Sequence, residues 1–131
     1  MKKDIAIVGG GYSGEYEISI QSAEVVRENL DKECYNVYLI IISDTDWIYR
    51  YENGGTYPVD KEEFTLDLPT GKVHFDAIFN AIHGTPGEDG RLQVLFDNLG
   101  IPYTSCDFVT SAITFNKYFC NCFVLEWQHN L

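Results

Sequence analysis

The chain has 131 residues, of which 45% are hydrophobic and 15% aromatic. A chain of this size and composition buries about two-thirds of its unfolded surface in one domain, which excludes a disordered tail. Twenty acidic residues against nine basic ones give a formal charge of -11. No stretch of the sequence gathers the basic residues into a stripe that could follow a phosphate backbone, so nucleic acid is not an expected partner.

The sequence shows no export signal, and this predicts both the cellular compartment and the redox state of the cysteines. No apolar run approaches the roughly 20 residues that cross a bilayer, and the first residues lead into a strand-like segment. We therefore expect a cytoplasmic protein that does not bind membranes. Its cysteines, Cys34, Cys106, Cys120 and Cys122, are expected to be reduced thiols. Cys120 and Cys122 lie two apart in a helix-like segment, which favours packing over binding one metal ion.

The first third of the chain predicts a βαβ unit. Residues 4–9 (DIAIVG) form a short apolar run typical of a strand. A glycine-rich turn over 9–14 precedes a helix that begins within residues 15–19 and ends near Leu30. Residues 35–43 (YNVYLIIIS) predict a second strand, buried on both faces of a parallel sheet.

The middle of the chain predicts an antiparallel ribbon around 45–75. Residues 47–51 alternate ahead of the turn signal at 53–55 (NGG), and residues 69–72 (PTGK) supply a second turn. The ribbon is expected as an insertion in the crossover between two strands of the sheet.

A second strand, loop and helix follow the ribbon. Residues 76–82 (DAIFNAI) resume the buried-strand pattern, residues 83–90 form a loop, and Arg91–Leu99 form an amphipathic helix. A short strand is expected within 100–104, and two helical segments are expected over residues 107–115 and 117–128.

These elements predict an α/β fold. We expect a small, mostly parallel four-stranded sheet with helices on both faces, plus the inserted antiparallel ribbon. No repeat or linker divides the chain, so residues 1–131 are expected to be a single domain.

Two glycine-rich loops are the candidate binding elements. Ligands of open parallel sheets bind at the carboxyl ends of the strands, where loops 9–17 and 83–90 both belong. The first loop matches G-x-G-x-x-G at Gly9, Gly11 and Gly14, which predicts a Rossmann-type dinucleotide-binding module as one alternative.

Charge counts against the dinucleotide alternative. Glu15 and Glu17 follow the turn, where a pyrophosphate needs bare helix N–H groups. The acid expected about 20 residues past the fingerprint is also misplaced, since Asp44 lies 30 residues past Gly14. A carboxylate pair there suits the ammonium of an amino acid, unless both acids only stabilise the helix dipole. His83 can donate to a carboxylate, unless it is merely a solvated loop histidine.

A third alternative is a non-enzymatic interaction domain. Its acidic surface would meet a basic partner, and the aromatic ribbon over residues 47–57 would serve as a docking edge.

Three motifs resemble the amino-terminal region of D-alanine–D-alanine ligases. They are residues 15–19 (EYEIS) after a Gly-Gly turn, residues 83–93 (HGTPGEDGRLQ) and residues 100–104 (GIPYT). An Asn-Lys pair at 116–117 follows them, and the order is that of the family up to about residue 120.

The resemblance implies a pre-ATP-grasp, Rossmann-like fold and an ATP-grasp enzyme of peptidoglycan synthesis. In this family, ATP with magnesium, or manganese in its place, converts the carboxylate of one D-alanine to an acyl phosphate. The amine of a second D-alanine then attacks. The implied partners are D-alanine and ATP, and a homodimer is the implied candidate assembly.

The resemblance also implies roles for single residues. Glu15 and His83 are the catalytic candidates, and Glu15, Ile18, Ser19 and His83 form the substrate-binding set. Glu15 would accept the ammonium of the first D-alanine, Ile18 would pack near its methyl, and His83 would face its carboxylate. Lys117 would reach toward the ATP phosphates, and no residue is expected to bind a metal.

The family continues into central and carboxyl-terminal domains that grip ATP. We expect residues 1–131 to be the amino-terminal substrate-binding domain, inactive alone, with residues 107–131 as a helical lead-in to the absent ATP-grasp domain. Residues 125–131 (LEWQHNL) do not resemble the family's continuation. A natural end, an engineered truncation and a shifted reading frame all stay open.

Overall fold

A computed structural model describes residues 2–12, 14, 16–51, 54–82 and 91–104. The elements in chain order are β1 (Lys3–Gly10), α1 (Tyr16–Asn29), β2 (Tyr35–Ile42), β3 (Trp47–Arg50), β4 (Thr56–Pro58), β5 (Thr65–Leu68), β6 (Gly71–His74), β7 (Ala77–Asn80), α2 (Arg91–Leu99) and β8 (Tyr103–Thr104). The loop predicted over 83–90 and the helical segments predicted over 107–128 lie outside the described residues.

The main sheet combines parallel and antiparallel strands. Its six strands lie in the order β4-β3-β2-β1-β7-β8, and β5 and β6 form a separate two-stranded sheet. β1 pairs in parallel with β2 and with β7, and β7 pairs in parallel with β8. β3 and β4 run antiparallel to their neighbours. The predicted α/β class is confirmed, with a mixed sheet and two helices in the part of the chain described.

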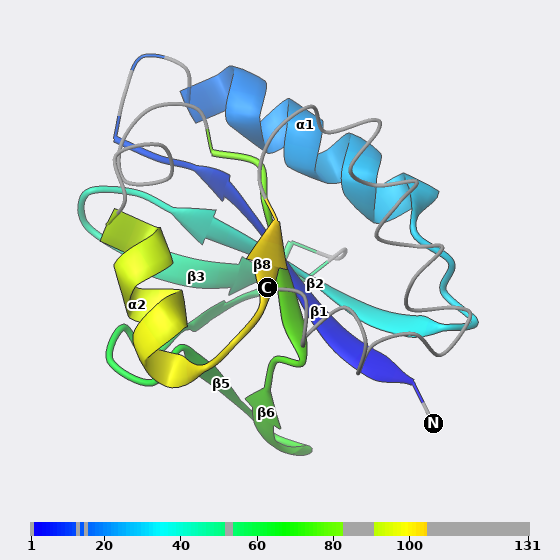
Figure 1. Cartoon of the computed structure of the whole chain (residues 1–131). Coiled ribbons are helices and arrows are strands. Elements are labelled where there is room, and N and C mark those ends of the chain that lie inside the picture. The colour runs from blue at the N-terminus through cyan, green and yellow to red at the C-terminus, as the bar shows by residue number, and fades with distance from the viewer. Residues whose placement is uncertain (1, 13, 15, 52–53, 83–90, 105–131) are drawn as a thin grey trace.

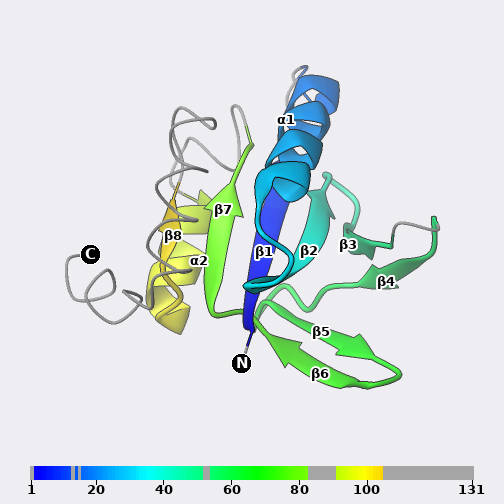
Figure 2. The ribbon, with the colours of Figure 1, turned by 90° about the vertical axis from the view of Figure 1, so that its right-hand side faces the viewer.

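The predicted strand number was wrong, because half of the ribbon belongs to the main sheet. β3 pairs with the outer edge of β2, with Ile48 opposite Ile41, and β4 continues the sheet outward. Without β3, β2 would expose a row of unpaired N–H and C=O groups. Only the β5–β6 hairpin stands apart, as Figure 2 shows, and a bridge between Val59 and Leu66 connects it to the chain after β4.

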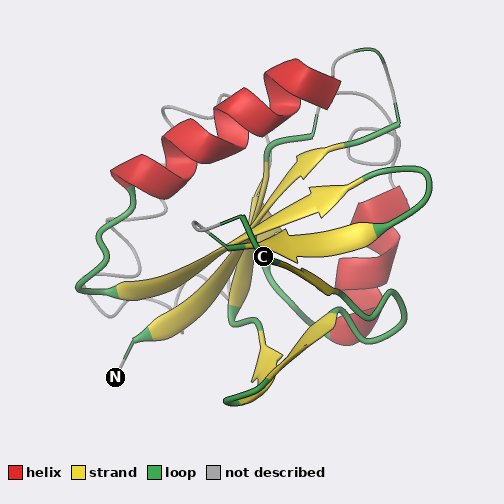
Figure 3. Ribbon diagram, turned by 180° about the vertical axis from the view of Figure 1, so that it is seen from behind, coloured by secondary structure: helices red, strands yellow, loops and turns green. Residues whose placement is uncertain are grey.

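The two helices cover opposite faces of the sheet (Figures 1 and 3). Along β1 the side chains alternate: Ile5 and Ile7 pack in the core beneath α1, whereas Ala6 and Val8 pack in the core that contains residues of α2. All four are 0% exposed, as expected for a central parallel strand. The prediction that the second strand is buried on both faces was wrong for the first half of β2. Asn36 is exposed and Val37 and Tyr38 are partly exposed, so only the last four residues are continuously buried.

The core on the α2 side includes four buried aromatic residues, Tyr49, Phe64, Phe75 and Phe96. The ring of Phe64 lies 5.4 Å from that of Phe75 and 5.1 Å from that of Phe96, measured between centroids. Tyr38 and Tyr49 meet edge to face at 5.4 Å. Such pairs add about 0.5–1.5 kcal/mol to the burial of their area. Of the aromatic residues over 47–57, Tyr49 is part of this core, and Trp47, Tyr51 and Tyr57 are partly buried and pack against it.

Gly100 ends α2 and turns the chain toward β8. Its φ is +72°, a conformation that glycine adopts without a steric penalty. The N–H of Gly100 donates to Asp97 O at 3.1 Å, and the N–H of Ile101 donates to Phe96 O at 3.0 Å. This pair of bonds is a Schellman motif, and it brings Tyr103 beside Ile78 of β7.

Within the described residues, neither helix is long and apolar enough to span a membrane.

A hydrogen-bonded pair of aspartates joins β1 to the start of β7. The N–H of Asp4 donates to Asp76 Oδ2 at 2.7 Å, and the N–H of Asp76 donates to Asp4 O at 2.7 Å. Asp4 Oδ1 accepts from Asn36 Nδ2 at 3.0 Å and from the Tyr38 hydroxyl at 3.4 Å. Burial, reinforced by the neighbouring charge of Asp4, raises the pKa of Tyr38 to about 12.

Tyr38→Phe is expected to reduce the loss of stability at alkaline pH. The folded chain holds the Tyr38 proton to a higher pH than the unfolded chain, where tyrosine has a pKa of about 10. Between about pH 10 and 12 the unfolded state therefore binds fewer protons, and the free energy of unfolding falls. Urea midpoints of both proteins across this range measure the effect, with Tyr12→Phe, at an exposed ring, as the control variant. Parallel curves for Tyr38→Phe and the parent chain would contradict this account.

Candidate functional site

The carboxyl ends of β1, β2 and β7 lie together at one edge of the sheet. In the strand register, Gly10 is opposite Ile42 of β2, and Val8 is opposite Asn80 of β7. Figure 2 shows the three strands running in the same direction toward this edge. Open α/β sheets bind their ligands at such an edge. We call it the strand-end edge.

The first half of α1 packs closely against this edge. A Cβ atom on Gly9 would lie 2.9 Å from Ala23 Cβ, and one on Gly10 would lie 2.5 Å from Ile42 O and 2.9 Å from Tyr16 Cε2. Gly10 also has a φ of +98°, which disfavours any residue with a side chain. The Gly-Gly pair is therefore explained by the packing of strand and helix, without a ligand.

Ser19 connects three segments at the strand-end edge. Its side chain is 0% exposed. The hydroxyl accepts a hydrogen bond from the Gly10 N–H at 3.0 Å and donates one to Ala81 O at 2.7 Å. One side chain of α1 thus joins the last residue of β1 to the residue that follows β7.

Asn80 and its neighbours fix the backbone where β7 ends. The Asn80 side chain is 3% exposed, and its Oδ1 accepts from the Ile82 N–H at 3.0 Å. The Ala81 N–H donates to Val8 O at 2.9 Å. Buried polar groups of this kind are costly to leave unpaired, so they hold the chain in one path up to Ile82.

The dinucleotide alternative is not favoured by this geometry. The Gly10 N–H is bonded to Ser19, and the Gly11 N–H donates to Ile42 O at 2.7 Å. These donors belong to the turn that must approach a pyrophosphate in the dinucleotide fingerprint. The third glycine of that fingerprint allows close packing of helix on strand, yet a Cβ on Gly14 would have nothing within 4 Å.

The described residues flank the predicted site rather than contain all of it. Ile18 is 57% exposed on the first turn of α1, whereas Ser19 is fully buried. Glu15, His83 and Lys117 lie outside the described residues. In the sequence, Glu15 directly precedes the first residue of α1, and His83 directly follows the segment fixed by Asn80. The structure thus describes the residue that follows Glu15, Tyr16, and the residue that precedes His83, Ile82.

Sequence reasoning missed the residues that shape the strand-end edge. Tyr16 packs over Gly10, and Asn80 is the polar residue inside an otherwise apolar strand. An amide within a buried run is a signal that could have been used, because a buried amide needs hydrogen-bond partners. Gly9 and Gly10 can be recognised in the sequence, but Ala23, which packs against Gly9, lies more than ten residues further along the chain.

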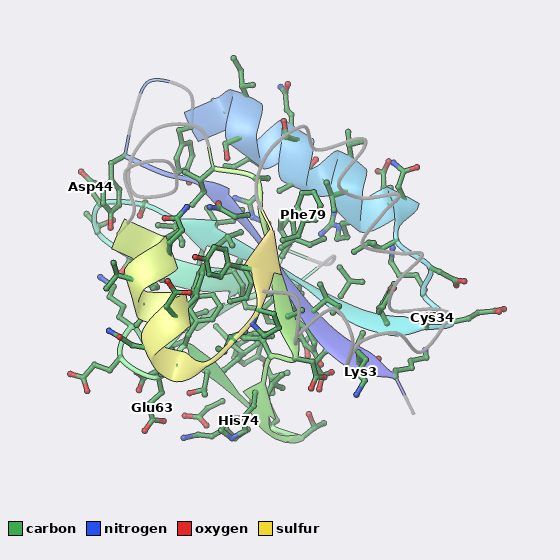
Figure 4. The ribbon with its side chains drawn as sticks, viewed as in Figure 1. Lys3, Cys34, Asp44, Glu63, His74 and Phe79 are labelled. Atoms are coloured by element: carbon green, nitrogen blue, oxygen red, sulfur yellow. The ribbon has the colours of Figure 1, made fainter. Side chains whose placement is uncertain are left out.

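The described residues do not assemble a metal centre. Among them, no three His, Cys, Asp or Glu side chains come together in a way that could hold a metal ion. Figure 4 shows Cys34, Asp44 and Glu63 at well-separated parts of the surface.

Comparison with known families gives the assignment. A family model described as D-ala D-ala ligase N-terminus matches residues 4–106, which is most of the chain. The chain belongs to this family. The match includes the strand-end edge and both segments predicted as glycine-rich loops, 9–17 and 83–90, so the resemblance based on the three motifs is confirmed.

Related ligases extend well beyond the matched segment. The D-alanine–D-alanine ligase of Flavobacterium johnsoniae is 49% identical over 115 residues, which are 88% of this chain and 36% of that protein. D-alanyl-alanine synthetase A from Vibrio cholerae has a TM-score of 0.67 and 31% identity, covering 93% of this chain and 36% of that one. The Bacillus anthracis ligase complexed with ATP has a TM-score of 0.55 and 28% identity, covering 86% and 31%. The chain therefore spans little more than a third of the curated relative's length.

Gly10→Ala is expected to destabilise the ligase domain strongly. The added methyl would meet Ile42 O at 2.5 Å in a backbone conformation unfavourable to alanine. Strain and overpacking together are expected to cost about 2–4 kcal/mol of the free energy of unfolding. Gly14→Ala is the matched control, because its Cβ meets nothing within 4 Å, and it should change stability by about 0.5 kcal/mol or less. Equal effects in urea unfolding would refute the close approach.

Titration with NAD or NADP is expected to show no saturation at micromolar concentration. The Gly10 and Gly11 donors are already bonded within the protein, and the net charge of -11 opposes a pyrophosphate. Isothermal calorimetry on the 131-residue chain measures the binding directly. Saturable micromolar binding that disappears in Gly11→Ala would restore the dinucleotide alternative.

Proposed function

We propose that this chain is the amino-terminal substrate-binding domain of an ATP-dependent ligase that joins two D-alanines for peptidoglycan synthesis. The observation that carries the proposal is the family match over residues 4–106, which contain the strand-end edge. In the reaction, the carboxylate of the first D-alanine attacks the γ-phosphate of ATP and forms an acyl phosphate and ADP. The amine of the second D-alanine then displaces phosphate and forms the peptide bond.

The proposed binding site for the first D-alanine lies at the strand-end edge. Glu15 accepts its ammonium, and His83 faces its carboxylate. Both are attached to well-anchored segments, since Tyr16 packs on Gly10 and Asn80 holds the backbone at Ile82. A desolvated ammonium needs a fixed carboxylate partner, which supports Glu15 in this role.

Ile18 and Ser19 complete the proposed substrate-binding set in different ways. Ile18 leaves 57% of its surface exposed at the start of α1, and the methyl of D-alanine would cover part of it. Ser19 is buried beside Gly10 and Ala81, so it acts on the substrate through its neighbours.

ATP and magnesium, with manganese as a substitute, are the proposed cofactors. Lys117 reaches toward the ATP phosphates, where a cation stabilises the charge that develops during phosphoryl transfer. The Bacillus anthracis relative was solved in complex with ATP, which supports nucleotide use by the whole ligase. Metal binding is assigned to no residue of this chain.

The wider setting of the domain is also proposed. Residues 1–131 form one domain of pre-ATP-grasp, Rossmann-like type, and residues 107–131 lead into the central ATP-grasp domain. The parallel arrangement of β2, β1, β7 and β8 supports this fold type. The complete enzyme works in the cytoplasm as a homodimer that binds neither nucleic acid nor membrane, and the fragment alone is inactive.

A chimeric ligase tests the activity and the role of Glu15. This chain replaces the 115-residue segment that it matches in the Flavobacterium johnsoniae ligase, and ATP hydrolysis is followed as a function of D-alanine. The parent chimera should hydrolyse ATP only with D-alanine present. Glu15→Gln should raise the KM for the first D-alanine by about tenfold or more, because a charge-assisted hydrogen bond contributes about 1.5–3 kcal/mol.

Glu28→Gln is the matched control, since it removes the same charge from the exposed far end of α1. It should leave both Michaelis constants within about twofold of the parent values. A folded chimera that ignores D-alanine would overturn the proposed activity. Equal effects of Glu15→Gln on both D-alanine sites would assign Glu15 to the helix dipole alone.

A further inference from the structure

We propose that Ser19 is a positioning residue that sets the separation of the two segments carrying Glu15 and His83. It does so through two buried hydrogen bonds that join the first turn of α1 to the ends of β1 and β7. The inference rests on the proposed function, because it assigns Glu15 and His83 to the first D-alanine.

The hydroxyl of Ser19 makes two hydrogen bonds inside the protein. It has a single proton, which it donates to Ala81 O at 2.7 Å, and it accepts the Gly10 N–H at 3.0 Å. The partners are 62 and 9 residues away in the sequence, and both bonds are buried. Removing the hydroxyl would leave a buried N–H and a buried C=O without this partner, so the segments would shift to satisfy them.

On the β1 side, the connection leads to Glu15. Ser19 lies within the first turn of α1, three residues after Tyr16. The Tyr16 ring packs so closely on Gly10 that a Cβ there would be 2.9 Å away. Because Ser19 also bonds Gly10, the helix start is held at two points, and Glu15 is the residue just before them.

On the β7 side, the connection leads to His83. Ala81, whose carbonyl accepts the Ser19 proton, lies two residues before His83. The next residue, Ile82, is held through its N–H by Asn80 Oδ1 at 3.0 Å. A shift of Ala81 is therefore passed on through Ile82 to the residue that follows it in the sequence, His83. Displacements of about 1 Å in groups that orient a substrate are enough to impair a reaction substantially.

A purely structural serine would give a different kinetic result. Loss of folded protein lowers the concentration of active enzyme and hence the apparent kcat, but a Michaelis constant does not depend on enzyme concentration. Displacement of Glu15 and His83 instead weakens binding of the first D-alanine. The KM for the first D-alanine therefore separates positioning from stability.

Ser22→Ala provides the matched control. Ser22 is a second buried serine of α1, 8% exposed and one turn further from the strand-end edge. Both substitutions remove one hydroxyl from the same helix. In the chimeric ligase, Ser19→Ala should raise the KM for the first D-alanine at least fivefold and leave the KM for ATP within twofold. Ser22→Ala should leave both unchanged.

The double variant tests whether Ser19 acts through Glu15. If it does, adding Ser19→Ala to Glu15→Gln should raise the KM by much less than Ser19→Ala does alone, because the residue being positioned has already lost its charge. Should Ser19→Ala fail to fold, Ser19→Cys, which keeps a weak donor and acceptor in nearly the same volume, is measured with the same expectation at smaller amplitude.

The outcomes separate the inference from the function on which it rests. A parent chimera without D-alanine-dependent ATP hydrolysis overturns the proposed function and the inference with it. An active parent in which Ser19→Ala lowers the melting temperature but leaves the KM for the first D-alanine unchanged overturns the inference alone. Independent, multiplying effects of Ser19→Ala and Glu15→Gln would also overturn it.

Discussion

The close contact between the end of β1 and the first turn of α1 governs the geometry of this domain. Two adjacent glycines leave room for the helix, because a Cβ on Gly9 would be 2.9 Å from Ala23 Cβ and one on Gly10 would be 2.9 Å from Tyr16 Cε2. Ser19 fills the same junction with a hydroxyl that bonds both neighbouring strand ends. The contact uses the backbone donors that a dinucleotide would need. It also holds the backbone at Tyr16 and Ala81 in a fixed relation.

The two faces of the sheet carry two cores of different composition. Beneath α1 the core is mainly aliphatic, whereas the core on the α2 side collects aromatic side chains from the ribbon, including Phe64 and Phe75. The β3–β4 half of the ribbon covers the outer edge of β2, which would otherwise be open to pairing with another chain. β3 reaches the strand-end edge, since Trp47 is opposite Ile42. The position of Ile18, exposed at that edge, is consistent with a surface that a small ligand covers.

The placement of the candidate site was predictable only in part. The three motifs identified the family, and the family match over residues 4–106 agrees with them. The predicted glycine-rich loops after two strands also placed the candidate site at the carboxyl ends of the strands. The neighbours Ile18 and Ser19 nevertheless differ sharply in the structure, since one is 57% and the other 0% exposed. A motif names both residues alike, whereas the side of the helix that meets the sheet determines which of them can touch a ligand.

Local patterns were sufficient for features that depend on neighbours in the sequence. The helix over Arg91–Leu99 and its end at Gly100 were readable from periodicity and from a residue that tolerates a φ of +72°. The six-stranded sheet was not readable, because hairpin signals specify the pairing of β3 with β4 but not the strand that receives them. The bonds of Ser19 were equally hidden, since Ala81 is 62 residues away. Contacts of that range form only when the packed faces of sheet and helix bring distant segments together.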